Sequence, residues 1–199
     1  PNDDYYQEIA LDIGLDFIHS IGDIELDNIV ESSGGGSAFL DYDQDGYIDL
    51  YLTSGSWKEG VSKQEKPGRI TENRLFRNRG DGTFENLTKK AGVGGPWYSM
   101  GVTVGDFNND GYPDILLTGD GPSGPVSKVY RNNGNNSFSE QTGIILMGVS
   151  NSSAAWGDFN NDGLSDILLS GHNNTGNGIT RIYRNNGDNT FTWQESIVL

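Results

Sequence analysis

The chain has 199 residues and a formal net charge of −15, so it repels nucleic acids and anionic membranes and favours cationic partners. It contains no cysteine, which excludes disulfides and thiolate metal sites, and no apolar stretch approaches the roughly 18 residues of a membrane-spanning helix. Its 29 glycines stand beside Asn, Asp and Ser between short apolar runs. That pattern predicts turn-rich β structure.

The opening segment repeats the spacing of a later segment. Residues 6–14 (YQEIALDIG) match residues 84–92 (FENLTKKAG) from an aromatic residue to a glycine. Because the later segment opens the last strand of a repeat unit, we expect residues 5–18 to form a lone outer strand.

The first repeat unit spans residues 31–92 and contains two hairpins. An acidic motif, DYDQDGYID at 41–49, lies between apolar runs whose lengths suit strands. A second motif, LFRNRGDGTF at 75–84, is typical of a glycine-rich hairpin turn. The unit therefore holds four strands.

The same unit follows twice more, at residues 98–143 and 150–199. Its acidic motifs are DFNNDGYPD at 106–114 and DFNNDGLSD at 158–166. We call residues 41–49, 106–114 and 158–166 the first, second and third acidic loops, and number their positions one to nine. The second motif recurs as VYRNNGNNSF and IYRNNGDNTF.

Repeated four-stranded antiparallel units predict an all-β fold of β-propeller-type blades, with the innermost strand first. We expect a single domain over residues 1–199, made of three blades and the N-terminal outer strand. Closed propellers have about four to eight blades. The propeller is therefore partial, as a fragment of a longer chain, or is assembled by further subunits that pair with its open edges.

Each acidic loop presents oxygen ligands with the spacing of a calcium loop. Side chains at positions one, three, five and nine point inward, the carbonyl oxygen of position seven adds a ligand, and glycine at position six permits the turn. The absence of nitrogen and sulfur donors favours Ca²⁺ over zinc or copper, and the number of protein ligands favours it over Mg²⁺. The predicted ligands of three Ca²⁺ sites are Asp41, Asp43, Asp45, Tyr47, Asp49, Asp106, Asn108, Asp110, Tyr112, Asp114, Asp158, Asn160, Asp162, Leu164 and Asp166.

Two other interpretations of these loops are weaker. An EF-hand needs flanking helices and a glutamate at position twelve, where this chain has Leu52, Leu117 and Leu169. A merely solvated turn rich in Asp and Asn does not account for three copies in register. We expect the first loop, with four carboxylates, to bind most tightly, and calcium to stabilise the fold. Weak calcium sites favour an extracellular, cell-surface or periplasmic location.

The acidic loops and the RNxG hairpins at 77–80, 131–134 and 184–187 resemble the FG-GAP (VCBS) repeats of integrin α-subunit propellers and their bacterial and cartilage-acidic-protein-type relatives. The resemblance covers nearly the whole chain. It implies a seven-bladed propeller used for adhesion, carbohydrate binding or scaffolding more often than catalysis. Such blades also accompany polysaccharide-degrading domains.

Several residues outside the loops are candidates for ligand contact. A basic insertion at 55–73 is the candidate partner surface, and Trp97, Tyr98, Trp156 and His172 are candidates for stacking on sugars, although core packing is favoured. We predict that Trp156, placed as the equivalent of Leu40, packs between blades. The Arg79–Asp81 triplet, RGD, aligns with turn residues of the next repeat and is assigned to the turn.

No catalytic constellation is found, since His19 and His172 lack a recognisable motif and the paired carboxylates are assigned to calcium. The sequence therefore predicts a non-enzymatic, extracytoplasmic calcium-binding module for adhesion, protein binding or scaffolding, with a protein or glycan partner. The alternatives are a lectin-like carbohydrate-binding module and the accessory blades of a polysaccharide-active enzyme.

Overall fold

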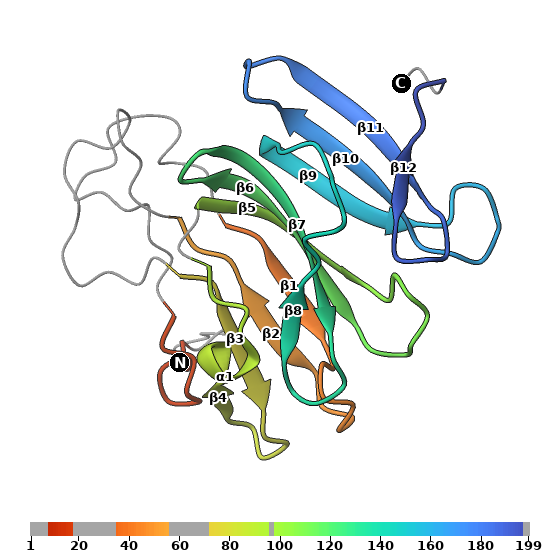
Figure 1. Cartoon of the computed structure of the whole chain (residues 1–199). Helices are drawn as coiled ribbons and strands as arrows, with labels where there is room; N and C mark the ends of the chain where they lie inside the picture. Colours follow the sequence, from red (N-terminus) through yellow and green to blue (C-terminus); the bar gives the residue numbers. More distant parts are fainter. Residues whose placement is uncertain (1–7, 18–34, 56–71, 96–97, 197–199) are drawn as a thin grey trace, which may run out of the picture.

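The fold consists of three four-stranded antiparallel sheets, each with its strands in chain order (Figure 1). The computed structural model describes residues 8–17, 35–55, 72–95 and 98–196. The first sheet contains β1 (Ser37–Leu40), β2 (Asp49–Leu52), β3 (Arg74–Asn78) and β4 (Phe84–Asn86). The second contains β5 (Tyr98–Gly105), β6 (Asp114–Gly121), β7 (Gly124–Asn132) and β8 (Phe138–Glu140). The third contains β9 (Ser150–Gly157), β10 (Asp166–His172), β11 (Gly178–Asn185) and β12 (Phe191–Trp193).

The first strands of the three sheets lie next to one another. β1 contacts β5, and β5 contacts β9, so the first strand of each sheet is its innermost strand, as predicted. In Figure 1, the three sheets follow one another in the colour order of the chain, from orange and yellow through green to blue. The all-β fold of blade-like sheets is confirmed, and the described strands form no closed ring.

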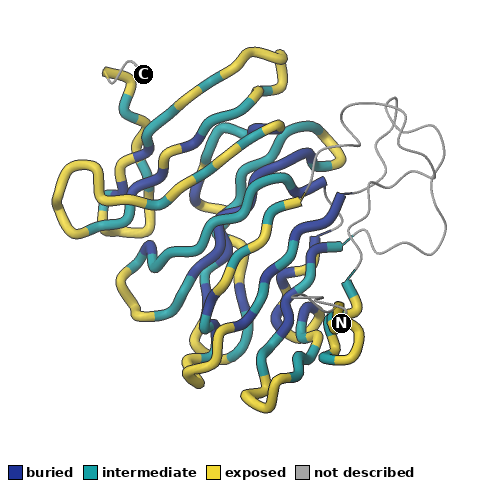
Figure 2. The backbone as a smooth tube through the Cα atoms, turned by 180° about the vertical axis from the view of Figure 1, so that it is seen from behind, coloured by how far each residue is buried: buried dark blue, intermediate teal, exposed yellow. Residues whose placement is uncertain are grey.

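Two hydrophobic cores hold the sheets together, one in each space between neighbouring sheets. The buried segments, dark blue in Figure 2, lie mainly on the strands that border these two spaces. The core between the first and second sheets includes Leu40, Tyr42, Tyr51, Leu75, Ile115, Leu117, Tyr130 and Phe138. The core between the second and third includes Phe107, Leu116, Val129, Ile167, Leu169 and Tyr183. Because strand side chains alternate between faces, β6 supplies both cores.

The predicted N-terminal outer strand is wrong for the residues that the structure describes. Residues 8–17 contain no strand but a turn over 10–14, in which the N–H of Ile13 donates to the carbonyl oxygen of Ile9 and that of Leu15 to that of Ala10. The predicted match to residues 84–92 explains why. There β4 ends at Asn86, a short helix α1 (Thr88–Ala91) follows, and Gly92 has a positive φ of 74°. Gly14 has the same left-handed conformation, with φ 85°. Residues 5–7 and 18 of the predicted strand lie outside the described residues.

The predicted equivalence of Trp156 and Leu40 is wrong, although the packing role is right. Trp156 pairs with Ile167, and Phe39 pairs with Leu50, the counterpart of Ile167 in the first sheet. Trp156 is thus equivalent to Phe39. A shift of one residue moves a side chain to the other face of the sheet. Trp156 accordingly faces the second sheet, where it stacks on Phe107 at 6.2 Å between ring centroids.

Candidate functional site

Each acidic loop joins the first two strands of its sheet and is folded by its position-one carboxylate. In the first loop, Asp41 accepts hydrogen bonds from the backbone N–H groups of Asp45 and Gly46, at 3.1 and 3.0 Å. Asp106 and Asp158 accept the equivalent pairs in the other two loops. Gly46 has a φ of 88°, which a residue with a side chain rarely adopts, so glycine at position six is a backbone requirement.

The position-nine aspartates are buried at the base of the loops. Asp49 accepts hydrogen bonds from the N–H of Tyr42, at 3.0 Å, and of Asn78, at 2.8 Å. Burial raises the pKa of Asp49 to about 6 and that of Asp114 to about 7, against an ordinary value of 3.8. Burial penalises the charged carboxylate, and a bound cation removes that penalty.

The first loop gathers three carboxylates at one point. Oxygens of Asp41, Asp43 and Asp49 all lie within 4.8 Å of one another. Oδ1 of Asp43 is buried and has no hydrogen-bond partner among the described residues. A buried carboxylate oxygen without a partner is costly, and a hard cation held by oxygen ligands satisfies it. The donor set of the first loop therefore fits Ca²⁺.

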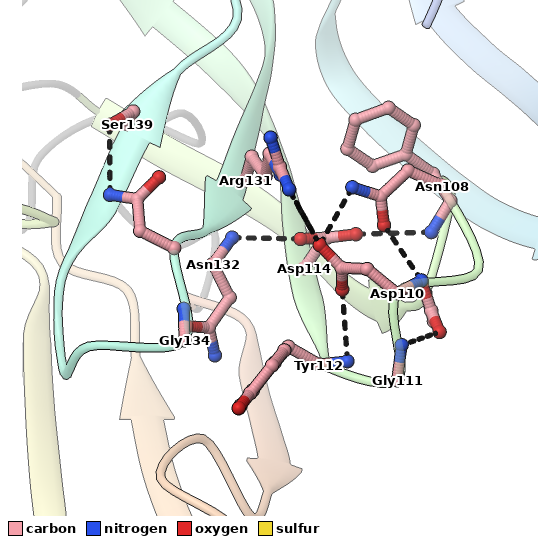
Figure 3. A network of polar contacts seen from close by, with 12 residues as sticks. Asn108, Asp110, Gly111, Tyr112, Asp114, Arg131, Asn132, Gly134 and Ser139 are labelled. Carbon is pink, nitrogen blue, oxygen red and sulfur yellow. Dashed lines mark hydrogen bonds and ion pairs between the residues drawn. The ribbon is translucent and has the colours of Figure 1, made fainter. Parts of the chain in front are cut away.

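The second and third loops differ from the first because position three is asparagine. Asn108 donates its side-chain amide to Asp110 at 2.9 Å, as Figure 3 shows, and Asn160 donates to Asp162 at 2.8 Å. In the part of the chain that the structure describes, neither loop brings three acidic side chains as close together as the first does. Each nevertheless keeps carboxylates at positions one, five and nine.

The predicted position-seven ligands are Tyr47, Tyr112 and Leu164. Each donates its backbone N–H to the position-five carboxylate of its own loop, at 2.9, 3.1 and 2.9 Å. No described backbone or side-chain group donates to their carbonyl oxygens, which leaves these oxygens available to a cation. For Asp45, this N–H bond and the Arg77 guanidinium hold the pKa below its usual range.

Two arginines at the loops were not predicted as site residues. Nε of Arg77 lies 2.6 Å from Asp43, its Nη2 lies 2.6 Å from Asp45, and Nη2 of Arg131 lies 2.9 Å from Asp110 (Figure 3). Arg77 lies on β3 and Arg131 on β7, both in the RNxG motif. Each arginine therefore places its positive charge at the acidic loop of its own sheet. In the third sheet, Arg184 donates to Asn186 instead. The recurrence of arginine at one position of every repeat was the signal in the sequence.

The other candidate residues take structural roles or lie outside the described residues. Tyr98 is 3% exposed, and Trp156 packs between the second and third sheets. His172 is exposed at the end of β10. In the RGD triplet, Arg79 pairs with Glu85 and Asp81 accepts hydrogen bonds from Thr83, so the triplet is part of its own turn. Trp97, His19 and residues 56–71 of the basic insertion fall outside the described ranges.

Acidic loops carried on a row of four-stranded blades define a propeller-type repeat protein. A family model described as the FG-GAP-like repeat matches residues 41–117 and 116–169. The chain belongs to this family. It is also similar to human cartilage acidic protein 1, with 51% identity over 45 residues. That match covers 22% of this chain and spans only 7% of the length of the human protein.

Membership of this family indicates an extracellular adhesion or protein-binding module and a binding role rather than a catalytic one. Among the described residues, no helix has the length and apolar character needed to cross a membrane.

Proposed function

We propose that this chain is a calcium-stabilised protein-binding module of extracellular proteins, in which each acidic loop holds one Ca²⁺. The observation that carries the proposal is the first loop, where three carboxylates meet and a buried oxygen of Asp43 lacks a partner. The other two loops keep the same fold and the same buried position-nine carboxylate. When bound, the ion neutralises these carboxylates and fixes both ends of each loop.

Calorimetric titration with Ca²⁺ tests this assignment. We expect three equivalents for the unchanged protein and for Asp43→Asn, which gives the first loop the asparagine that the other two loops have at position three, but a calcium affinity of the first loop lowered to that of the other two. The matched control is Asp81→Asn, which removes one charge from a neighbouring turn outside the loops. It should retain three equivalents and leave the affinity of the first loop unchanged. Equal weakening by both substitutions would show a diffuse charge effect and contradict a defined site.

The third sheet has an open face that supports a second, independent proposal of self-association. Phe159 and Leu168 on this face are 41% and 44% exposed. Their counterparts in the second sheet, Phe107 and Leu116, are 1% and 0% exposed, because the third sheet covers them. Phe39 lies on the face of the first sheet that points away from the second sheet, and it is 75% exposed. We propose that the third sheet of one copy packs against the first sheet of another.

Light scattering over a range of protein concentrations tests the self-association. We expect the mass to rise with concentration, and Leu168→Asp to abolish the rise. The matched control is Leu11→Asp, because Leu11 is 76% exposed on the N-terminal turn and away from the sheet face. A monomer at every concentration would contradict the proposal.

A carbohydrate-binding function has less support. Of the aromatic candidates that the structure describes, Tyr98 and Trp156 are committed to packing and offer no free ring for stacking on a sugar.

A further inference from the structure

An asparagine at equivalent positions of the second and third sheets links neighbouring acidic loops at both interfaces between the sheets. Asn132 of the second sheet donates its side-chain amide to the carbonyl oxygen of Tyr42, position two of the first loop, at 2.8 Å. Asn185 of the third sheet donates in the same way to Phe107, position two of the second loop, at 2.7 Å. Both asparagines are buried.

These bonds belong to a continuous chain between position-nine carboxylates. At the first interface, the N–H of Tyr42 donates to Asp49 at 3.0 Å, and the N–H of Asn132 donates to Asp114 at 2.8 Å (Figure 3). The path from Asp49 to Asp114 therefore consists of three hydrogen bonds between residues that are at most 1% exposed.

The chain continues across the second interface. Asp114 accepts a second bond from the N–H of Phe107, at 3.1 Å, and the N–H of Asn185 donates to Asp166, at 2.7 Å. The closing carboxylates of all three loops are thus joined in one buried network. Hydrogen bonds in a low-dielectric interior polarise one another, and their geometry is fixed by the packing around them.

A second bridge runs between the loops nearer the surface. The side-chain amide of Gln44, position four of the first loop, donates to the carbonyl oxygen of Gly111 in the second loop, at 2.6 Å. Asn109 donates likewise to Gly163 in the third loop, at 3.2 Å. Asn161, the equivalent residue of the third loop, makes no such bond within the described part of the chain.

We propose that these two bridges couple the acidic loops, so that calcium bound in one loop raises the calcium affinity of its neighbours. This inference rests on the proposed calcium binding. An ion that orders one loop fixes its closing carboxylate and the peptide groups that the next loop contacts. The next ion then binds a loop that is already partly ordered, which is positive cooperativity.

The test is a calcium titration followed by nuclear magnetic resonance at the backbone amides of Gly46, Gly111 and Gly163, one in each loop. Asp106→Asn is used to weaken the second loop while keeping a side-chain oxygen for its turn. We expect the midpoints of the first and third loops to move to calcium concentrations about fivefold higher or more. Working at 0.15 M salt screens the direct effect of the lost charge.

A second variant breaks a bridge without changing charge. Asn109 has a φ of 56°, so Asn109→Gly preserves the backbone and removes only the amide. It should raise the midpoint of the third loop and reduce that loop's response to Asp106→Asn. Asn161→Gly is the matched control, with a φ of 58° and no bridge, and should change neither.

Two results would overturn the proposal, and they are distinguishable. If Asp106→Asn abolishes the response at Gly111 but leaves the other two midpoints unchanged, the loops bind calcium independently, and the proposed function stands without coupling. If no loop amide responds to calcium in the unchanged protein, the coupling and the proposed calcium binding both fail.

Discussion

The guanidinium of Arg77 pairs with Asp43 through Nε, at 2.6 Å from the carboxylate oxygen Oδ2. The same guanidinium pairs with Asp45. The first loop therefore contains a tethered cation beside two of its predicted calcium ligands. A positive charge fixed there neutralises the loop in the absence of metal and repels an incoming cation.

Removing this charge should tighten calcium binding. We expect Arg77→Gln to raise the affinity of the first loop by about fivefold, corresponding to about 1 kcal/mol for a partly exposed ion pair. Arg184→Gln is the control, since Arg184 contacts Asn186 and, among the described residues, no loop carboxylate. Calorimetry measures both affinities, and an unchanged or weaker affinity in Arg77→Gln would show that the arginine positions the ligands instead of opposing the metal.

Calcium binding should depend on pH between about 5 and 8. Burial raises the pKa of Asp49 to about 6 and that of Asp114 to about 7, so the metal-free fold holds these protons more tightly than the unfolded chain does. Their contribution to stability is complete below the ordinary pKa of 3.8 and is lost as the pH rises through 6 and 7. Calcium requires the ionised carboxylates, so its affinity should rise over the same range.

Calorimetry in buffers with different ionisation enthalpies measures the protons released when calcium binds. We expect release at pH 6 and little release at pH 8. The metal-free protein should become less stable to urea from pH 5 to pH 8. Calcium binding that releases no protons at pH 6 would mean that these two aspartates are not ligands.

Trp156 should contribute strongly to the packing of the third sheet on the second. Its ring stacks on Phe107 and contacts Phe191, so Trp156→Ala should lower the free energy of unfolding by about 3 kcal/mol or more. Trp193 is a matched control because it is 39% exposed and lies against the guanidinium of Arg181. Trp193→Ala should cost about 1 kcal/mol or less. Urea denaturation compares them, and similar losses would contradict the packing role.

The blades and the loops could be predicted from the sequence because each is a local pattern repeated three times. Position one, position six and position nine have backbone roles that recur in every copy, and the structure places them as the motif requires. The N-terminal segment was harder, because its match to residues 84–92 included the turn at Gly92 as well as the strand. The turn lies in the described residues 8–17.

The contacts between blades could not be predicted, because they join residues that are distant in sequence. Asn132 and Tyr42 are 90 residues apart, and only the stacking of two sheets brings them together. The position of Trp156 was within reach of the sequence. Trp156 lies two residues before Asp158, as Phe39 lies two residues before Asp41, and the strand pairing with Ile167 confirms this equivalence.

Thermal unfolding with calcium, with magnesium at the same concentration and with excess chelator measures how much calcium stabilises the fold. Calcium at about 100 times its dissociation constant adds about 2.7 kcal/mol per site to the stability. We expect a midpoint at least about 5 °C higher in calcium than in chelator, with a smaller rise in magnesium. A midpoint that is equal in all three solutions would contradict calcium stabilisation of the fold.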